Sequence, residues 1–486
     1  MRRPLFTVPS LPVHCLPLPR GLDPLESLLS LKGEGPSVLL DGQPPSHERN
    51  RRAIVLFDPF DVVAIPAGSD RIGRGDPLGE LFEKIARYGG GTAPSPPSFA
   101  GGAAGFLSYD LGRHLERLPA TAGLRSAVPD LWFGLFNRGV LFDLASGEAR
   151  LFCTEIEAAG RAGPEYARRS LREARDRILA GPPAPRSGVA AGPLVSNFNH
   201  AEYRAAVEAV RESIRSGDVY QVNLSQRFEA ACDADPFALY RRLRRLNPAP
   251  FSALVDTGEA QLLSSSPERF LRLLGDMVET RPIKGTRPRT GASGPDRIQV
   301  RELMQSRKDA AELAMIVDLL RNDLGKVARY GSVVVKEAAR LEAYATVFHR
   351  EAVIQARLRE GLTGEDLLKA TFPGGSVTGA PKIRAMELIE ELEGIRRGAF
   401  TGSIGWIGFD GDLELNIAIR TLILEAGRAH FHCGGGVVLD SDPEEEYRET
   451  LAKGRALANA LGCSFPGDSD DLTGEGLVFT SGPAFP

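Results

Sequence analysis

The stretch RKDAAELAMIVDLLRNDLGKVARYGSVVVKEAARL, residues 307–341, joins a long apolar helix directly to a valine-rich strand. A second helical stretch, PGGSVTGAPKIRAMELIEELEG (373–394), and a second strand, RAHFHCGGGVVLD (428–440), follow it. These elements do not alternate in the regular strand–helix–strand order of a parallel sheet. The pattern therefore indicates an α+β or mixed α/β protein, and we predict the α+β class.

Composition and charge limit the kinds of partner. The chain has 486 residues, 42% hydrophobic and 25% charged, which is typical of a soluble globular protein of two or three domain-sized units. Its 63 acidic and 59 basic residues give a net charge of −4, so no overall field attracts nucleic acid or an anionic membrane. No run of about 18 apolar residues predicts a membrane span.

The cysteines indicate a reducing compartment. Five of them are scattered along the chain without a C-x-x-C spacing, which argues against a disulfide framework or a zinc knuckle. Prolines interrupt the first 21 residues where an export signal would need an apolar run. We expect a cytoplasmic protein.

A Gly-, Pro- and Ala-rich stretch divides the chain between two helical patterns. We predict an N-terminal region at 1–185, a linker at 186–196, a C-terminal domain at 197–464 and a flexible tail at 465–486.

The stretch RPIKGTRPR, residues 281–289, concentrates cations in a nearly neutral chain and predicts a site for an anion. Sixteen residues before Lys284, Glu268 lies in SSSPERF, and strand-like segments lie between the two. A hairpin of this length can bring the carboxylate beside the amine, where it could exchange protons. By spacing alone, an ion pair at the surface is the commoner outcome.

Three glutamates suggest a metal. Glu312 lies inside the apolar helix, and Glu446 and Glu449 are three residues apart, so a helix places them on one face. Oxygen ligands at this spacing suit Mg²⁺, which keeps several waters and is often shared with an anionic substrate. A solvated helix face is the alternative.

A glycine-rich loop, PGGSVTGAPK (373–382), has the glycine spacing of a phosphate loop but Ala380-Pro381 where Lys-Ser/Thr is required. We therefore exclude a nucleotide loop. Backbone N–H groups at the start of a helix suit a carboxylate, and a plain helix-entry turn is the alternative.

The HFHC run, residues 430–433, has a structural interpretation. In a strand, His430 and His432 share one face while Cys433 points to the other, so the three cannot hold one metal ion. Cys433 also lacks the preceding glycine of a nucleophile elbow. We predict no glutaminase portion in this sequence.

Six ordered blocks resemble the chorismate-utilising enzymes and cover residues 197–458. The blocks are SSSPERF, RPIKGTRPR, ELAMIVDLLRNDLGKVA, FPGGSVTGAPKIRAMELIEELE, GSIGWIGFDGDLELNIAIRT and GGGVVLDSDPEEEYRET. Two earlier stretches, LDPLESLLSLKGEG and GGAAGFLSYDLGRHLE, resemble the N-terminal part of anthranilate synthase component I and aminodeoxychorismate synthase component I. The resemblance implies the anthranilate-synthase-component-I-like fold: two intimately packed α/β subdomains with facing β-sheets and an active site between them.

The resemblance also assigns roles to residues. It implies Mg²⁺ ligation by the carboxylates of Glu312 and Glu449, with Glu446 as a further or water-mediated ligand. It implies a substrate-binding set that holds the carboxylates of chorismate: Thr286, Arg420, Gly434, Gly435, Gly436 and Lys453. His349 aligns with the active-site histidine of the family, although Arg350 and Glu351 depart from the usual residues after it.

Two positions separate the branches of the family. Isochorismate and salicylate synthases are similar to each other in having a water-activating lysine where YQVNLSQR (220–227) has Gln221, so water is not the expected nucleophile. Anthranilate synthases have PIAGT, whereas PIKGT with Lys284 is typical of aminodeoxychorismate synthases. Anthranilate synthase component I is the alternative assignment. A non-catalytic regulatory protein would need decayed catalytic blocks.

The expected reaction is therefore amination of chorismate to 4-amino-4-deoxychorismate, for 4-aminobenzoate and folate synthesis. Replacing the 4-hydroxyl with retained position needs two allylic displacements, and Lys284, as a neutral amine, can be the first nucleophile. Glu268 would accept a proton or protonate the leaving hydroxyl, and His349 would orient that hydroxyl. Ammonia would come from a separate glutaminase subunit.

Overall fold

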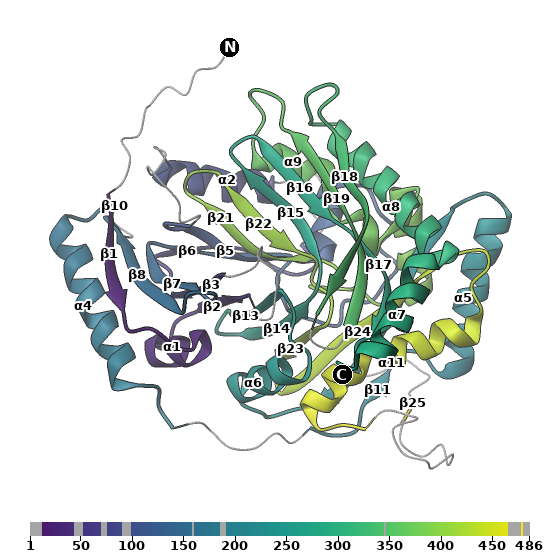
Figure 1. Cartoon of the computed structure of the whole chain (residues 1–486), viewed down its shortest axis with the longest axis horizontal. Helices are drawn as coiled ribbons and strands as arrows, with labels where there is room; N and C mark the ends of the chain where they lie inside the picture. The colour runs from purple at the N-terminus through teal and green to yellow at the C-terminus, as the bar shows by residue number, and fades with distance from the viewer. Residues whose placement is uncertain are drawn as a thin grey trace.

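The computed structural model describes residues 12–42, 52–69, 75–89, 99–157, 160–184, 191–344, 347–464 and 478–479. Two sheets lie between layers of helices (Figure 1). The helices in these ranges are α1 (Pro24–Leu31), α2 (Pro77–Tyr88), α3 (Gly112–Leu115), α4 (Pro164–Ala180), α5 (His200–Arg215), α6 (Pro236–Leu246), α7 (Ser293–Gln305), α8 (Arg307–Gly325), α9 (Gly364–Thr371), α10 (Lys382–Glu393) and α11 (Pro443–Leu461), with 3₁₀ turns η1 (Tyr109–Leu111) and η2 (Gly375–Val377).

The larger sheet, sheet A, contains 13 of the described strands: β1 (Val13–Leu18), β2 (Ser37–Asp41), β3 (Arg52–Phe57), β7 (Arg138–Asp143), β8 (Glu148–Thr154), β11 (Val195–Ser196), β12 (Gln221–Ala231), β13 (Phe251–Asp256), β14 (Ala260–Ser266), β20 (Gly379–Ala380), β23 (Thr421–Glu425), β24 (Arg428–Val437) and β25 (Val478–Phe479). Its pairings are antiparallel apart from β11 with β25. In the register, Arg227 of β12 lies opposite His432 of β24, and Asn223 lies opposite Gly436.

The second sheet, sheet B, contains ten of the described strands: β4 (Asp61–Ile65), β5 (Gly102–Leu107), β6 (Leu131–Phe136), β15 (Arg269–Leu274), β16 (Met277–Arg281), β17 (Ile283–Pro288), β18 (Val334–Ala343), β19 (Val347–Arg357), β21 (Ser403–Gly408) and β22 (Leu413–Asn416). A small separate ribbon pairs β9 (Ile156–Glu157) with β10 (Gly160–Arg161). Helices and antiparallel sheets of this kind confirm the predicted α+β class.

Apolar side chains form three layers. One layer packs α1, α4, α5, α6, α10 and α11 on sheet A, and another packs α2, α8 and α9 on sheet B. The third lies between the sheets, where Phe106 and Trp406 of sheet B meet Val255 and Ile423 of sheet A. The two sheets therefore face each other, as predicted.

Local sequence signals set the helix boundaries. Asp23, Asp76, Asp235 and Asp442 cap the helices that follow them, and a proline comes directly after each of these caps. Asn199 and Glu202 form a reciprocal capping box at α5. No helix in the described ranges is both long enough and apolar enough to span a membrane.

The prediction of a helix through residues 373–394 was wrong in its first part. Helix α10 begins at Lys382, and the preceding residues form η2 and the short strand β20. Proline removes a backbone donor, and Pro373 and Pro381 bound the segment that is not α-helical.

Strands from both sides of the predicted linker share the two sheets. For example, β2 pairs with β13, and β5 pairs with β21. The linker at 186–196 therefore stays a prediction. Its last two residues form the short strand β11. The predicted flexible tail lies outside the described residues except for β25.

Candidate functional site

Glu268 and Lys284 come together because β15 and β16 form a hairpin between them. The Glu268 side chain is only 5% exposed, so the interpretation as a surface ion pair was wrong. Burial raises the pKa of Glu268 to about 7, although the Ser376 hydroxyl and the nearby Lys284 ammonium act in the opposite direction. A carboxyl that titrates near neutrality suits general acid–base chemistry.

Lys284 projects from sheet B toward sheet A. Its Nζ lies 3.7 Å from Oε2 of Glu312 on α8. A Cβ placed on Gly436 of β24 would lie 2.9 Å from the same Nζ, so the glycine leaves room for this close approach.

The amide of Gln221 also adjoins Gly436. Gln221 is fully buried, and neither its Nε2 nor its Oε1 has a hydrogen-bond partner among the described residues. An unpaired amide of this kind beside an amine can donate to and accept from a bound ligand.

Other cations of the RPIKGTRPR stretch are engaged elsewhere. Arg281 pairs with Glu279, Arg287 with Asp309, and Arg289 with Asp296. Carboxylates of the protein therefore balance these three arginines. Lys284 is the cation of the stretch whose side chain lies beside Glu268 and Glu312.

Glu446 and Glu449 lie on one face of α11 beside Gly435. A Cβ on Gly435 would lie 2.9 Å from Oε2 of Glu446 and 3.5 Å from Oε1 of Glu449. The pKa of Glu446 is raised by burial and by the charge of Glu449, while Lys453 holds the pKa of Glu449 below its usual range. Lys453 Nζ contacts Glu449 at 2.5 Å and donates to the carbonyl of Gly434 at 2.8 Å.

Glu446 and Glu449 are the carboxylates of the site whose oxygens could bind a magnesium ion. Repulsion between Glu446 and Glu449 is the kind that a divalent cation relieves, and Mg²⁺ commonly binds through one or two carboxylates with waters and substrate oxygens. Within the described ranges, no three His, Cys, Asp or Glu side chains converge as a metal site, and Glu312 faces Lys284. A metal ion here would therefore be bound by the carboxylates of Glu446 and Glu449 together with oxygens of a bound ligand.

His349, Thr286 and Arg420 form the third part of the site. Thr286 Oγ1 lies 2.9 Å from Nδ1 of His349, across the β17–β19 pairing. Burial and the charge of Arg420 lower the pKa of His349 to about 4, so the imidazole is neutral at physiological pH. Arg420 has a positive φ of 53°, and burial lowers its pKa. No residue in the described ranges forms a hydrogen bond or ion pair with its guanidinium, which interacts at longer range with Glu449.

All twelve predicted site residues therefore belong to one connected region. Sequence reasoning missed Ser376, which donates to Glu268, and Lys308, whose charge acts on Glu446 and Glu449. Lys308 could have been found, because it lies four residues before Glu312 on the same helix. Ser376 lay in the quoted glycine-rich loop, but nothing in that pattern pointed its hydroxyl toward Glu268.

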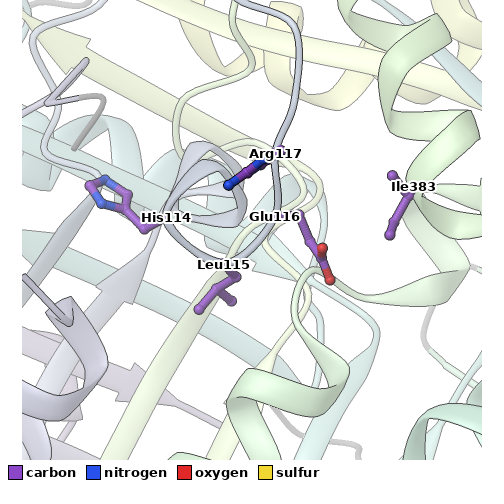
Figure 2. A pocket seen from close by; sticks show the side chains of 5 residues that line it. All are labelled: His114, Leu115, Glu116, Arg117 and Ile383. Atoms are coloured by element: carbon purple, nitrogen blue, oxygen red, sulfur yellow. The ribbon is translucent and has the colours of Figure 1, made fainter. Parts of the chain in front are cut away.

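Two other features lie apart from these residues. A surface pocket of about 460 Å³ is lined by His114, Leu115, Glu116, Arg117 and Ile383 (Figure 2), and none of the predicted site residues lines it. In the HFHC run, His430 bonds to Glu425 at 2.9 Å and His432 stacks on Phe400.

Buried carboxyls, lysines and a free guanidinium at the junction of two sheets define an enzyme site for an anionic substrate. Residues 35–459 match the chorismate binding enzymes, and the chain belongs to this family. It is a chorismate-utilising enzyme of the anthranilate/aminodeoxychorismate synthase type.

Similar proteins carry both names. The chain is 40% identical to aminodeoxychorismate synthase component 1 of Bacillus subtilis over 391 residues, 80% of this chain and 82% of that protein. It is 42% identical to an anthranilate synthase component 1 of Haloarcula marismortui over 372 residues, 74% and 76% of the two chains. The crystal structure of anthranilate synthase component I from Streptococcus pneumoniae superposes with a TM-score of 0.74 at 33% identity, covering 86% of this chain and 94% of that one.

Proposed function

We propose that this enzyme aminates chorismate at C4 to give 4-amino-4-deoxychorismate. The observation that supports this most is the position of Lys284. Its amine lies next to Gly436 of β24, beside Glu268 and Gln221. Anthranilate synthases typically have alanine at this position. Overall identity does not favour either product, because relatives of both names are about equally similar.

The proposed reaction has two displacements at one allylic system. The Lys284 amine attacks C2, the two conjugated double bonds of the ring shift, and the 4-hydroxyl leaves as water with a proton from Glu268. Ammonia then attacks C4, both double bonds shift back, and the bond from C2 to the lysine nitrogen breaks to release a free amine. Glu268 can transfer protons in this sequence because its pKa of about 7 leaves both protonation states populated.

Substrate binding is assigned first to Arg420, whose guanidinium has no hydrogen bond or ion pair with the described residues. The Arg420 guanidinium and the backbone of Gly434, Gly435 and Gly436 would hold the chorismate carboxylates, assisted by Lys453 and Thr286. Neutral His349 would orient the 4-hydroxyl. Glu446 and Glu449, with Glu312 nearby, would hold Mg²⁺, which when bound supplies positive charge to an anionic substrate.

Ammonia would come from a separate glutaminase subunit. The relatives are named as component 1 of their synthases, and Cys433 is buried with its pKa raised to about 12, unlike a thiol nucleophile. We place the enzyme in the cytoplasm, where it would supply the 4-aminobenzoate branch of folate synthesis.

Product analysis tests the proposal. With chorismate, Mg²⁺ and ammonium, the enzyme should form a product that keeps its enolpyruvyl group and becomes 4-aminobenzoate only after a separate lyase is added. Anthranilate, detected by fluorescence and chromatography, should be a minor product. Anthranilate as the main product would instead support the anthranilate synthase assignment.

A further inference from the structure

Ser376 is a buried serine whose hydroxyl reaches the acid–base carboxyl of the site. Its Oγ donates to Oε1 of Glu268 at 2.6 Å, and both side chains are less than a tenth exposed. This separation is in the range of hydrogen bonds from a hydroxyl to an ionised carboxylate. Bulk water therefore does not compete for the contact.

The turn that carries Ser376 is fixed by its neighbours. A Cβ on Gly375 would lie 2.8 Å from Leu319 of α8, and one on Gly374 would lie 2.6 Å from Ile417, so the glycines let the turn pack closely against both. The Thr378 hydroxyl donates back to the carbonyl of Gly374 at 3.1 Å. The position of the Ser376 hydroxyl is set before any substrate binds.

The backbone of Glu268 is held as well. Its N–H donates to Oγ of Ser266 at 3.3 Å, and its carbonyl accepts from the N–H of Ile417 at 3.0 Å. The side chain has few remaining determinants: the Ser376 hydroxyl, the backbone of Ile283, and Lys284, which is the charged group that faces it. Removing one of them should change both the orientation and the ionisation of the carboxyl.

We propose that Ser376 is a positioning residue for the reaction, which acts by holding Oε1 of Glu268 and thereby directing the carboxyl toward the Lys284 amine and the leaving hydroxyl. The proposal rests on the proposed function, since that function gives Glu268 its proton-transfer role. It assigns a task to the PGGSVTGAPK loop: the loop holds a carboxylate of the enzyme through a side-chain hydroxyl. A donor fixed in this way needs no rearrangement during the reaction.

The direction of the expected effect follows from the hydrogen bond. A hydroxyl that donates to the carboxylate stabilises the ionised form, so Ser376→Ala should raise the pKa of Glu268 further. The expected shift is about one pH unit, as for the loss of one charge-assisted hydrogen bond. The limb of the pH–rate profile that reports the ionisation of Glu268 should move to higher pH by the same amount, whether Glu268 acts as an acid or as a base.

Infrared titration of the full-length enzyme measures the pKa of the Glu268 carboxyl in the absence of substrate. The carboxyl band of Glu268 is identified in protein labelled with ¹³C-glutamate as the band missing from Glu268→Gln. Its midpoint should rise by about one unit in Ser376→Ala and stay near the wild-type value in Ser376→Thr, which keeps the hydroxyl. Thr378→Val is the matched control. It also removes a hydroxyl from this turn, but the Thr378 hydroxyl donates to the carbonyl of Gly374 and not to Glu268.

A folded Ser376→Ala variant with an unchanged midpoint would overturn the proposal. If that variant does not fold, Ser376→Cys replaces it, because a thiol of similar size is a weaker donor. A smaller upward shift is then expected, and no shift would overturn the proposal equally. The titration needs no substrate, so its outcome is independent of whether product analysis supports amination at C4. Where the wild type is active, a pH–rate limb that moves together with the infrared midpoint distinguishes positioning of Glu268 from a general loss of structure.

Discussion

Replacing Glu268 by glutamine should make the protein more stable at alkaline pH while removing its proposed proton-transfer group. Burial raises the pKa of Glu268 from 4.5 to about 7. Between these values the folded protein binds more protons than the unfolded chain. The stability that Glu268 contributes by this proton uptake is complete below about pH 4.5 and is lost as pH rises through about 7.

The size of the effect follows from the shift. At about 1.4 kcal/mol per pH unit, ionising the buried carboxyl costs the native state roughly 3 kcal/mol. Glutamine has nearly the same volume, stays neutral, and offers an amide oxygen that can still accept from Ser376. Glu268→Gln should therefore exceed the wild type by roughly 3 kcal/mol at alkaline pH and should match it at acidic pH.

Calorimetry at about pH 4 and about pH 8.5 measures this difference. For a chain of 486 residues, roughly 3 kcal/mol corresponds to a shift in Tm of about 3 °C. Glu391→Gln, which replaces an exposed glutamate of α10, is the control for removing one negative charge. A variant no more stable than the wild type at alkaline pH, or equally stabilised at both pH values, would refute the reasoning.

Three further predictions concern the reaction. Glu449→Ala should lower kcat by about 10²-fold or more, since it removes a carboxylate proposed to hold Mg²⁺, and full wild-type activity in EDTA would contradict the magnesium assignment. The isolated chain should use ammonium at alkaline pH but not glutamine; glutamine-dependent turnover without a second protein would show a glutaminase activity that we do not expect. Mass spectrometry of the protein and its peptides, with chorismate and no ammonia, should detect an adduct on the peptide containing Lys284. Lys284→Ala should lack this adduct but keep some ammonia-dependent turnover through the remaining binding groups. A wild type without an adduct would argue against the covalent step and leave the product assignment unchanged.

Local sequence patterns predicted the elements of the fold better than their assembly. The apolar helix at 307–325 and the valine-rich strand after it are encoded by their own residues. The pairing of β12 with β24 joins segments about two hundred residues apart, and no local pattern specifies it. The prediction that the two sheets face each other came only from the family resemblance. The glycine-rich loop was predicted as part of a helix because the residues after Pro381 have helical periodicity and do form α10.

The site shows the same division. A hairpin of suitable length could bring Glu268 to Lys284, but spacing does not determine burial, and it is burial that raises the pKa of Glu268 to about 7. Gln221 marked a branch of the family in the sequence, whereas its unpaired, fully buried amide beside Lys284 appears only when β12, β17 and β24 are assembled. A hydroxyl or amide has no periodic signal, since its role depends on the group it faces.

The position of the new nitrogen tests the proposed function most directly. The enzyme is incubated with chorismate, Mg²⁺ and ¹⁵N-ammonium, and the product is analysed by NMR before any lyase is added. The label should appear on C4 of a product that retains the enolpyruvyl group. Label on C2, or on anthranilate that has lost the enolpyruvyl group, would contradict the assignment that rests on Lys284.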